Sequence, residues 1–299
     1  MSFGITLRIM SYNRPDYLKE ALDSAFDQTV PFDSIEVYDN GSRPEVLRFL
    51  DEYGRGIKIR KFSPNSKTTW ECAFGELCES NFLCVFHDDD VVGQDFVKIT
   101  LENFKRIPHL VAHSSNGRRI GADGRIERGL LLNVGRSLIF SDPAKLAEHC
   151  LDSCIPWAPT TYLWNNRLGE NYRKARMYGR LEDVGMFFFI LQGGAIYLEK
   201  NPLYDCRTHP DSGSQRLGWH EEEQLWNICH KNYPPNPAGW RKIKLKLQKR
   251  YTDRWFHDWL KSSPGLPHLV WRKLSLSALH RCCRNNKLKI LRRVVAGKL

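Results

Sequence analysis

The chain has 299 residues, 41% of them hydrophobic, which is enough for one large α/β domain or for one domain with an appendage. Its net charge of +11 is uneven, because residues 240–299 hold 17 Lys or Arg and two Asp, whereas residues 1–239 hold 28 basic and 32 acidic residues. The nine cysteines include no Cys-x-x-Cys pair, and no apolar run is long enough to span a bilayer, which argues against a disulfide framework, a zinc site and secretion.

Strands and helices are predicted to alternate from residue 5 to residue 92, because short apolar runs alternate with apolar residues at helical spacing. The predicted strands are Ile5–Met10, Ile35–Tyr38, Ile57–Arg60 and Phe82–Phe86, and the predicted helices are Pro15–Phe26, Pro44–Tyr53 and Thr68–Cys78. This order predicts a parallel sheet with right-handed crossovers and helices on both faces. The glycine-rich dinucleotide loop is absent after the first strand, which argues against NAD or FAD and is compatible with a mononucleotide.

The buried strand Phe82–Phe86 leads into three adjacent aspartates, Asp88-Asp89-Asp90. Neighbouring carboxylates repel one another unless a cation neutralises them, and their hard oxygen atoms suit magnesium or manganese. Ligands of open α/β sheets bind beyond the carboxyl ends of the strands, where we expect these residues to lie. The alternative is a solvated acidic turn that caps the next helix, and the buried strand in front of the turn favours the metal site.

The pattern is less regular after the acidic segment. The later predicted elements are a helix over Phe96–Ile107, a strand at Leu110–Ala112, a turn at Gly121–Gly124, a helix over Val184–Leu191 and a strand at Ala195–Leu198. From Arg125 onward the sequence shows no regular period.

Five short motifs follow one another along the chain: Ser11-Tyr12-Asn13-Arg14-Pro15, Asp39-Asn40-Gly41-Ser42, Asp88-Asp89-Asp90, Leu181-Glu182-Asp183 and Tyr204-Asp205-Cys206-Arg207-Thr208-His209. In this order they resemble the motifs of family 2 glycosyltransferases with the GT-A fold. The resemblance implies a Rossmann-like α/β domain over residues 1–239, with a mostly parallel sheet flanked by helices. Residues 1–92 would form its nucleotide-binding half and residues 93–239 its acceptor-side half.

The resemblance also implies a divalent cation, Mn²⁺ or Mg²⁺, at the acidic segment. Asp89 or Asp90 would bind the metal, Asp88 would orient the donor, and His209 would complete the site. For His209 the alternative is an ordinary exposed loop histidine.

A nucleotide-sugar donor is implied at the ends of the first two strands. Asp39 and Asn40 would bind the base and ribose, Tyr12 would stack on the base, and Lys67 would reach a phosphate. The alternatives are a turn-forming Asp39, a core tyrosine and a solvated lysine. The other implied donor residues are Ser11, Asn13, Arg14, Asp88 and Asp89, with Arg207 as a weaker diphosphate ligand.

Glu182 and Asp183 precede an apolar helix. The resemblance implies that Asp183 is the general base that deprotonates the acceptor hydroxyl, with Glu182 as its orienting partner and second choice. A single displacement of this kind inverts the anomeric carbon. Capping of the helix by the two carboxylates is the alternative.

Residues 240–299 are predicted to form a basic amphipathic helical extension. Aromatic and aliphatic residues recur at helical spacing among many Lys and Arg residues: Trp240, Ile243, Leu247, Tyr251, Trp255 and Trp259. This pattern is typical of a helix that lies on an anionic membrane, although a helix packed on the body has the same pattern. We expect no nucleic-acid partner, because no motif supports one.

The leading interpretation is an inverting, metal-dependent glycosyltransferase. It would move a sugar from a UDP- or dTDP-linked donor to a saccharide or lipid-linked saccharide acceptor in the synthesis of a bacterial surface polysaccharide. A nucleotidyltransferase that forms nucleotide sugars is one alternative, and a non-catalytic, membrane-associated binding module is another. We expect a cytoplasmic location, with peripheral attachment to the inner face of the cytoplasmic membrane as an open alternative.

Overall fold

The structure, a computed structural model, describes residues 2–64, 67–153, 160–163, 168–209 and 228. The chain divides into two compact units, residues 1–232 and 233–299, and the second lies outside the described residues. The predicted boundary between residues 239 and 240, and the predicted helices of the C-terminal extension, therefore stay predictions.

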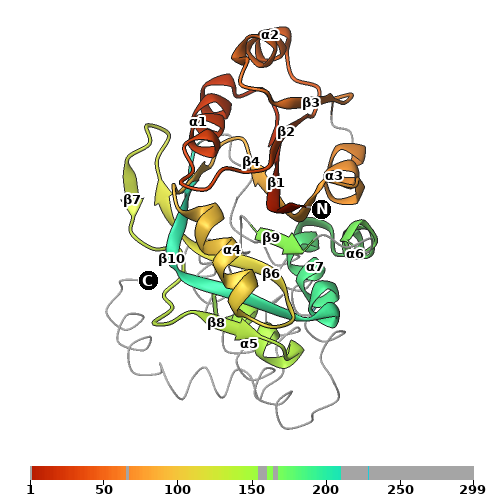
Figure 1. Cartoon of the computed structure of the whole chain (residues 1–299), viewed down its shortest axis with the longest axis vertical. Coiled ribbons are helices and arrows are strands. Elements are labelled where there is room, and N and C mark those ends of the chain that lie inside the picture. The colour runs from red at the N-terminus through yellow and green to blue at the C-terminus, as the bar shows by residue number, and fades with distance from the viewer. Residues whose placement is uncertain (1, 65–66, 154–159, 164–167, 210–227, 229–299) are drawn as a thin grey trace, which may run out of the picture. The chain divides into compact units, whose positions relative to one another are not determined.

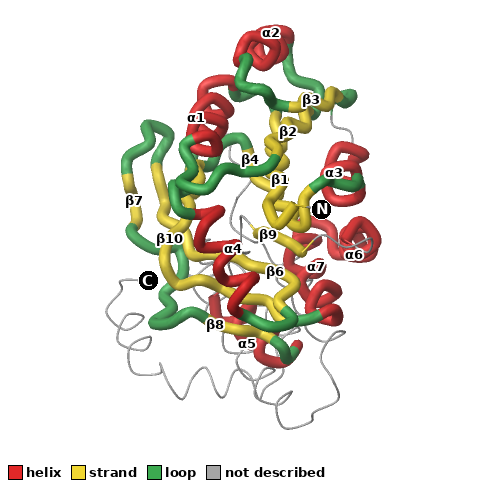
Figure 2. Tube along the Cα trace, viewed as in Figure 1, coloured by secondary structure: helices red, strands yellow, loops and turns green. Residues whose placement is uncertain are grey.

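One mixed sheet runs through the described part of the chain, with the strand order β3-β2-β1-β4-β9-β6-β10-β5 (Figures 1 and 2). Strand β7 pairs with β6, and strand β8 pairs with β10. The strands are β1 (Ser2–Ser11), β2 (Ser34–Asp39), β3 (Lys58–Lys61), β4 (Ser80–His87), β5 (Val91–Val92), β6 (Leu110–Ile120), β7 (Ile126–Arg128), β8 (Leu138–Phe140), β9 (Thr160–Leu163) and β10 (Ala195–Arg207). Strands β1 to β4 pair in parallel, which confirms the predicted α/β sheet for this half.

Helices flank the sheet on both faces (Figure 1). Their bounds are α1 (Pro15–Phe26), α2 (Pro44–Tyr53), α3 (Lys67–Gly75), α4 (Phe96–Arg106), α5 (Pro143–Ser153), α6 (Leu168–Ala175), η1 (Arg176–Leu181), α7 (Glu182–Ile190) and η2 (Leu191–Gly193). Prolines stand in the first turn of α1 and α2, where a missing N–H costs nothing, and Gly54 ends α2 with φ of 71°. Helix α2 has the predicted bounds, and α1 begins and ends where predicted.

The core beneath α1 and α4 is built from alternate residues of β1 and β4. Odd-numbered residues of β1 and even-numbered residues of β4 are buried against apolar side chains of these helices: Ile5, Leu7, Ile9, Phe82, Cys84, Phe86, Leu18, Leu22, Phe96 and Val97. The alternation follows from the two-residue period of a strand.

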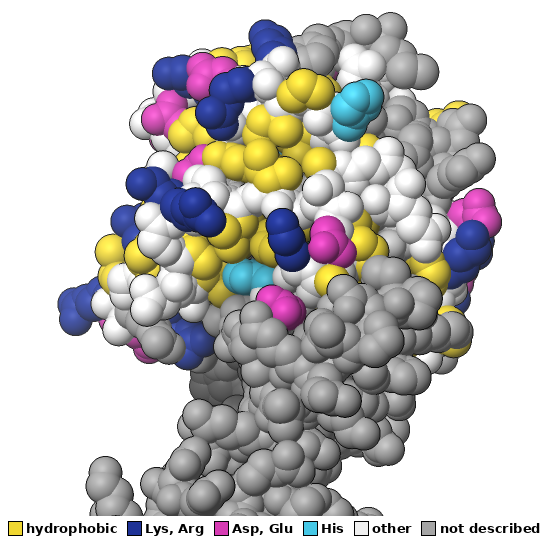
Figure 3. Space-filling view, turned by 90° about the horizontal axis from the view of Figure 1, so that it is seen from below, with side chains coloured by type: hydrophobic (Ala, Val, Ile, Leu, Met, Phe, Trp, Pro, Cys, Tyr) yellow, Lys and Arg dark blue, Asp and Glu magenta, His cyan; other side chains and the backbone are white. Residues whose placement is uncertain are grey.

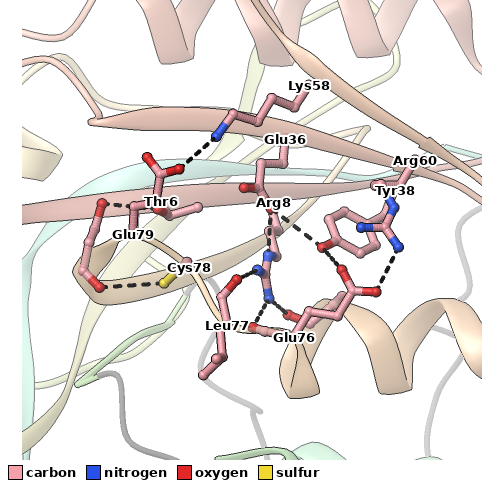
Figure 4. Close-up of polar contacts among 12 residues, drawn as sticks. Thr6, Arg8, Glu36, Tyr38, Lys58, Arg60, Glu76, Leu77, Cys78 and Glu79 are labelled. Atoms are coloured by element: carbon pink, nitrogen blue, oxygen red, sulfur yellow. Dashed lines mark hydrogen bonds and ion pairs between the residues drawn. The ribbon is translucent and has the colours of Figure 1, made fainter.

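The other face of β1 carries a buried arginine that holds helix α3 (Figure 4). Arg8 is 1% exposed and forms an ion pair with Glu36 at 2.8 Å. Its guanidinium also donates to the carbonyls of Ala73, Glu76 and Leu77 at 2.6, 2.9 and 3.4 Å. These carbonyls lie at and beyond the C-terminus of α3, where a helix leaves acceptors without partners. Helix α3 ends at Gly75, three residues earlier than predicted.

The second half differs more from the predictions. Strand β6 continues to Ile120 and strand β10 to Arg207, and the two pair in parallel along most of their length. Strand β9 lies between β4 and β6 and is antiparallel to both. The irregular region after Arg125 contains β7, β8, α5, β9 and α6, which were not predicted.

The surface shows apolar side chains among basic ones on the face turned toward the reader in Figure 3. In the described part of the chain, the exposed large hydrophobic residues include Leu77, Ile126, Leu130, Ile139 and Met177. No helix in the described ranges is both long and apolar enough to cross a membrane. Contact between residues 240–299 and an anionic membrane surface stays a prediction.

Candidate functional site

The carboxyl ends of β1, β2 and β4 meet at one edge of the sheet. Ser11 is in register with Asp39, and Met10 is in register with His87, so the acidic segment follows directly beside Ser11. Ser11 and Asp39 are each 1% exposed. The Ser11 Oγ and Asp39 Oδ1 atoms have no hydrogen-bond partner among the residues that the structure describes. Such atoms are costly to bury, so they indicate a place for a polar ligand.

Asp39 also shapes the loop that follows β2. Its Oδ2 atom accepts hydrogen bonds from the backbone N–H groups of Gly41 at 3.1 Å and Ser42 at 2.9 Å. The Asn40 side chain accepts from the Thr69 hydroxyl at 3.0 Å, which joins this loop to α3. The turn-forming role is therefore real, but it uses only one of the two carboxylate oxygens of Asp39.

The loop after β1 is fixed against the loop after β2. Asn13 has φ of 59°, a left-handed conformation that asparagine tolerates. Its N–H donates to Ser42 Oγ at 2.9 Å, and its Oδ1 accepts from the Arg43 N–H at 2.8 Å. Tyr12 is 39% exposed, so the alternative of a core tyrosine is wrong.

Arg14 binds the acidic segment from the N-terminus of α1. Its Nη2 lies 3.0 Å from Asp88 Oδ1, and its Nη1 lies 2.5 Å from Asp89 Oδ2. His209 Nε2 lies 3.0 Å from the same Asp89 oxygen and 3.1 Å from Arg14 Nη1. Asp88 accepts a second bond, from the Tyr12 N–H, at 2.8 Å. The structure thus brings four predicted site residues together, and it buries His209 rather than exposing it.

Burial dominates the ionisation of the acidic segment. It raises the pKa of Asp88 to about 7, although Arg14 and the Tyr12 N–H lower it. It raises the pKa of Asp90 to about 8, and the charge of Asp89 adds to this. Burial also acts to raise the pKa of Asp89, but His87, His209 and Arg14 outweigh it, and the net shift is downward. Asp89 is therefore the most readily ionised of the three.

A second arginine, Arg207 at the end of β10, holds the backbone of the acidic segment. Its Nε donates to the Asp89 carbonyl at 2.9 Å, and its N–H donates to Asp90 Oδ1 at 2.9 Å. Its guanidinium also forms an ion pair with Glu20 and lies 4.6 Å from the ring centre of Tyr17. With 1% side-chain exposure, Arg207 supports the site through these contacts, and its predicted contact with a diphosphate stays a prediction.

Tyr17 and Glu20 contribute to this arrangement and were not predicted. The Tyr17 ring lies 5.1 Å from the His209 ring, and Glu20 pairs with Arg207. Together with Arg14 they recur every three residues in the sequence, which places them along one face of α1. That spacing was visible in the sequence and could have identified them.

A divalent cation fits part of this set. Asp89 and His209 offer a carboxylate oxygen and an imidazole nitrogen 3.0 Å apart, and the Arg14 guanidinium already brings positive charge to that point. Among the described residues no group of three or more His, Cys, Asp or Glu side chains is arranged to hold a metal. The other ligands would come from water or phosphate oxygens, as is usual for Mg²⁺. Metal binding by Asp90 stays a prediction, since its Oδ1 accepts the Arg207 N–H.

Glu182 and Asp183 form the first turn of α7. Asp183 accepts the Val184 N–H at 2.8 Å, and Glu182 accepts the Tyr172 hydroxyl at 3.1 Å. Burial raises the pKa of Asp183 to about 6, and the Glu182 charge adds to the effect. These contacts are compatible with both predicted roles of the two carboxylates, capping of α7 and general-base catalysis by Asp183. Lys67 begins α3, and its side chain lies outside what the structure describes.

Comparison with known proteins now adds the family. A sequence model described as glycosyl transferase family 2 matches residues 6–163. Chondroitin synthase of Escherichia coli is 25% identical over 192 residues, which cover 61% of this chain and 27% of that protein. Hyaluronan synthase of Pasteurella multocida is 25% identical over 190 residues, which cover 61% of this chain and 19% of that protein. The chain therefore spans about a quarter, or less, of the length of these relatives.

Solved structures of S. aureus TarS share the fold. The TarS 1–349 complex with UDP-GlcNAc aligns with a TM-score of 0.59 and 14% identity over 84% of this chain and 73% of that one. The complex with UDP aligns with a TM-score of 0.58 and 13% identity over 92% of this chain and 76% of that one. Since the family match covers more than half of the sequence, this chain belongs to glycosyl transferase family 2.

Proposed function

We propose that this chain is an inverting glycosyltransferase that takes a sugar from a UDP- or dTDP-linked donor. The relatives are named as polysaccharide synthases, and the TarS structures hold UDP-GlcNAc or UDP. A saccharide or lipid-linked saccharide of a bacterial surface polysaccharide is the proposed acceptor.

The observation that carries the proposal is the pair of buried, unpartnered oxygens at the ends of β1 and β2, Ser11 Oγ and Asp39 Oδ1. A uracil or thymine ring offers an imide N–H that a carboxylate oxygen can accept, and a ribose offers hydroxyls. The exposed Tyr12 ring stands on the neighbouring loop, where it can stack on a base. The nucleotide would therefore be bound by atoms that the fold leaves without partners.

The acidic segment would receive the diphosphate. Asp89 and His209 would hold Mn²⁺ or Mg²⁺, which when bound supplies a Lewis acid for the diphosphate leaving group. Asp88, fixed by the Tyr12 N–H, would orient the donor sugar or ribose.

Asp183 would deprotonate the acceptor hydroxyl. Its pKa of about 6 suits a base that is ionised at neutral pH and still takes up a proton readily. Glu182, held by Tyr172, would keep the neighbouring carboxylate in place.

The experiment is a donor screen with Mn²⁺ that measures released nucleoside diphosphate and pyrophosphate separately. We expect a UDP or dTDP sugar to yield nucleoside diphosphate with a saccharide acceptor. Both Asp39→Ala and Asp89→Ala should release little nucleoside diphosphate. The first variant should lose donor binding, and the second should lose metal-dependent donor binding. Arg55→Gln is the matched control, because Arg55 pairs with Asp23 in the last turn of α1, at the end of that helix away from Arg14.

Release of pyrophosphate would contradict the proposal and indicate a nucleotidyltransferase. Full activity in EDTA would contradict metal dependence. Undiminished activity of Asp39→Ala would contradict the nucleotide site.

A further inference from the structure

Arg14 occupies the position at which a cation would bind the acidic segment. Its guanidinium contacts Asp88 at 3.0 Å, Asp89 at 2.5 Å and His209 at 3.1 Å. These contacts include the Asp89 oxygen and the His209 nitrogen that are the two side-chain ligands in the proposed metal site. A guanidinium and a divalent cation compete for this point, because both are positive and repel each other at such short distances.

The backbone that carries Arg14 is fixed, whereas its side chain is not buried. Asn13 is bonded to Ser42 and Arg43, and the Arg14 carbonyl accepts the Leu18 N–H at 2.9 Å as α1 begins. The Arg14 side chain is 26% exposed. Its guanidinium can therefore leave the carboxylates by rotation about side-chain bonds, with no change in the loop.

We propose that Arg14 is a built-in competitor of the divalent cation. The side chain neutralises Asp88 and Asp89 until a metal bound to a nucleoside diphosphate displaces it, and the diphosphate then offers the displaced guanidinium a new anionic partner. When a metal ion binds without nucleotide, it gains a contact with Asp89, but the protein loses the ion pairs of Arg14. The metal ion alone therefore binds weakly. Metal and nucleotide together avoid that loss, and by linkage each raises the affinity for the other by the same factor. This inference rests on the proposed metal site.

The test measures Mn²⁺ binding from the EPR signal of free Mn²⁺, with and without UDP. Arg14→Gln removes the competing charge, and Arg55→Gln removes an equal charge from the Asp23 pair in the last turn of α1. We expect Arg14→Gln to bind Mn²⁺ alone on the order of tenfold more tightly than wild type, since charge-assisted bonds of this kind are lost when the metal binds. We expect UDP to tighten Mn²⁺ binding clearly less in Arg14→Gln than in wild type. Arg55→Gln should match wild type in both measurements.

Arg14→Lys provides a second variant if Arg14→Gln does not fold. A lysine keeps the charge but has no planar fork for two carboxylates, so its Mn²⁺ affinity should lie between those of wild type and Arg14→Gln. Equal Mn²⁺ affinity in wild type and the Arg14 variants, while wild type binds Mn²⁺ with UDP, would overturn this inference alone. Failure of every protein to bind Mn²⁺ with or without UDP would overturn the metal site as well.

Discussion

One buried histidine, His113 on β6, should contribute a loss of stability in mild acid. His113 is 0% exposed, and its two ring nitrogens lie 3.1 Å from Thr100 Oγ1 and 3.2 Å from Asn103 Nδ2. The Asn103 Oδ1 atom accepts from Arg106 at 2.6 Å, so its amide nitrogen faces the ring as a donor. His113 Nε2 must then accept, and the proton must be on Nδ1. The bond that Nε2 accepts from Asn103 requires a neutral ring, because a protonated Nε2 has no lone pair to accept it.

The magnitude follows from the pKa of this histidine. Burial among Phe96, Phe104 and Tyr197 lowers its pKa to about 3, whereas an unfolded histidine titrates near 6.5. At a pH between these two pKa values, His113 is protonated in the unfolded chain but not in the folded chain. The contribution of His113 to the free energy of unfolding should therefore fall by about 1.4 kcal/mol for each pH unit below 6.5. From pH 6.5 to pH 5 the loss is about 2 kcal/mol, a substantial part of the 5–15 kcal/mol typical of a domain.

Urea unfolding followed by circular dichroism at several pH values measures this loss. Asp88, Asp90 and Asp183 have raised pKa values and contribute with the opposite sign, so the informative quantity is the difference between variants. His113→Gln keeps a donor and an acceptor but cannot titrate, so wild type should lose stability relative to His113→Gln as the pH falls from 6.5 to 5. His109→Asn, at an exposed position with φ of 59°, is the matched control. Equal pH dependence in wild type and His113→Gln would refute the reasoning.

Three further predictions follow from the catalytic assignment, the buried arginine and the basic extension. Asp183→Asn should still bind donor but lose turnover by roughly 10²–10⁴-fold, and the wild-type rate should fall below about pH 6 as Asp183 is protonated, both of which steady-state kinetics can check. Arg8→Met should lower the free energy of unfolding by about 3–5 kcal/mol in urea titrations, because Glu36 and three carbonyls lose a buried cation, and a loss under 1 kcal/mol would contradict this. Residues 240–299 should cosediment with anionic but not neutral liposomes, less at high salt, and less again in a Trp255→Ala, Trp259→Ala variant.

The sequence predicted the first half of the fold well because local signals agree there. Strands β1 to β4 are short apolar runs separated by helices with prolines in their first turns. Strand β6 shows why the second half was harder. Its residues from His113 to Asn116 are buried although they are polar, and Thr100 and the Leu132 backbone form hydrogen bonds with two of them, His113 and Asn116. A hydrophobicity pattern does not detect such a strand.

The site was predicted as a set of residues but not as a set of contacts. Asp39, Asp88 and Asp89 could be placed from the strand ends alone, because parallel strands bring their carboxyl ends to one edge. The contact of Arg14 with Asp89 joins residues 75 positions apart, and that of His209 with Asp89 joins residues 120 apart. Local patterns contain no information on such contacts.

Two arginines hold the acidic segment, and their surroundings give them different tasks. Arg207 binds backbone carbonyls, the Glu20 carboxylate and the Tyr17 ring, and its side chain is 1% exposed. Removing it from these partners would leave buried acceptors without donors, so it can only be a fixed support. Arg14 binds two side-chain carboxylates, of which Asp89 is also a proposed metal ligand, and it is 26% exposed. An arginine whose partner has another cation available, and whose own charge has water available, can be displaced when that cation binds. Arg207 and Arg14 therefore differ in their burial and in their binding partners, not in the charge that both carry.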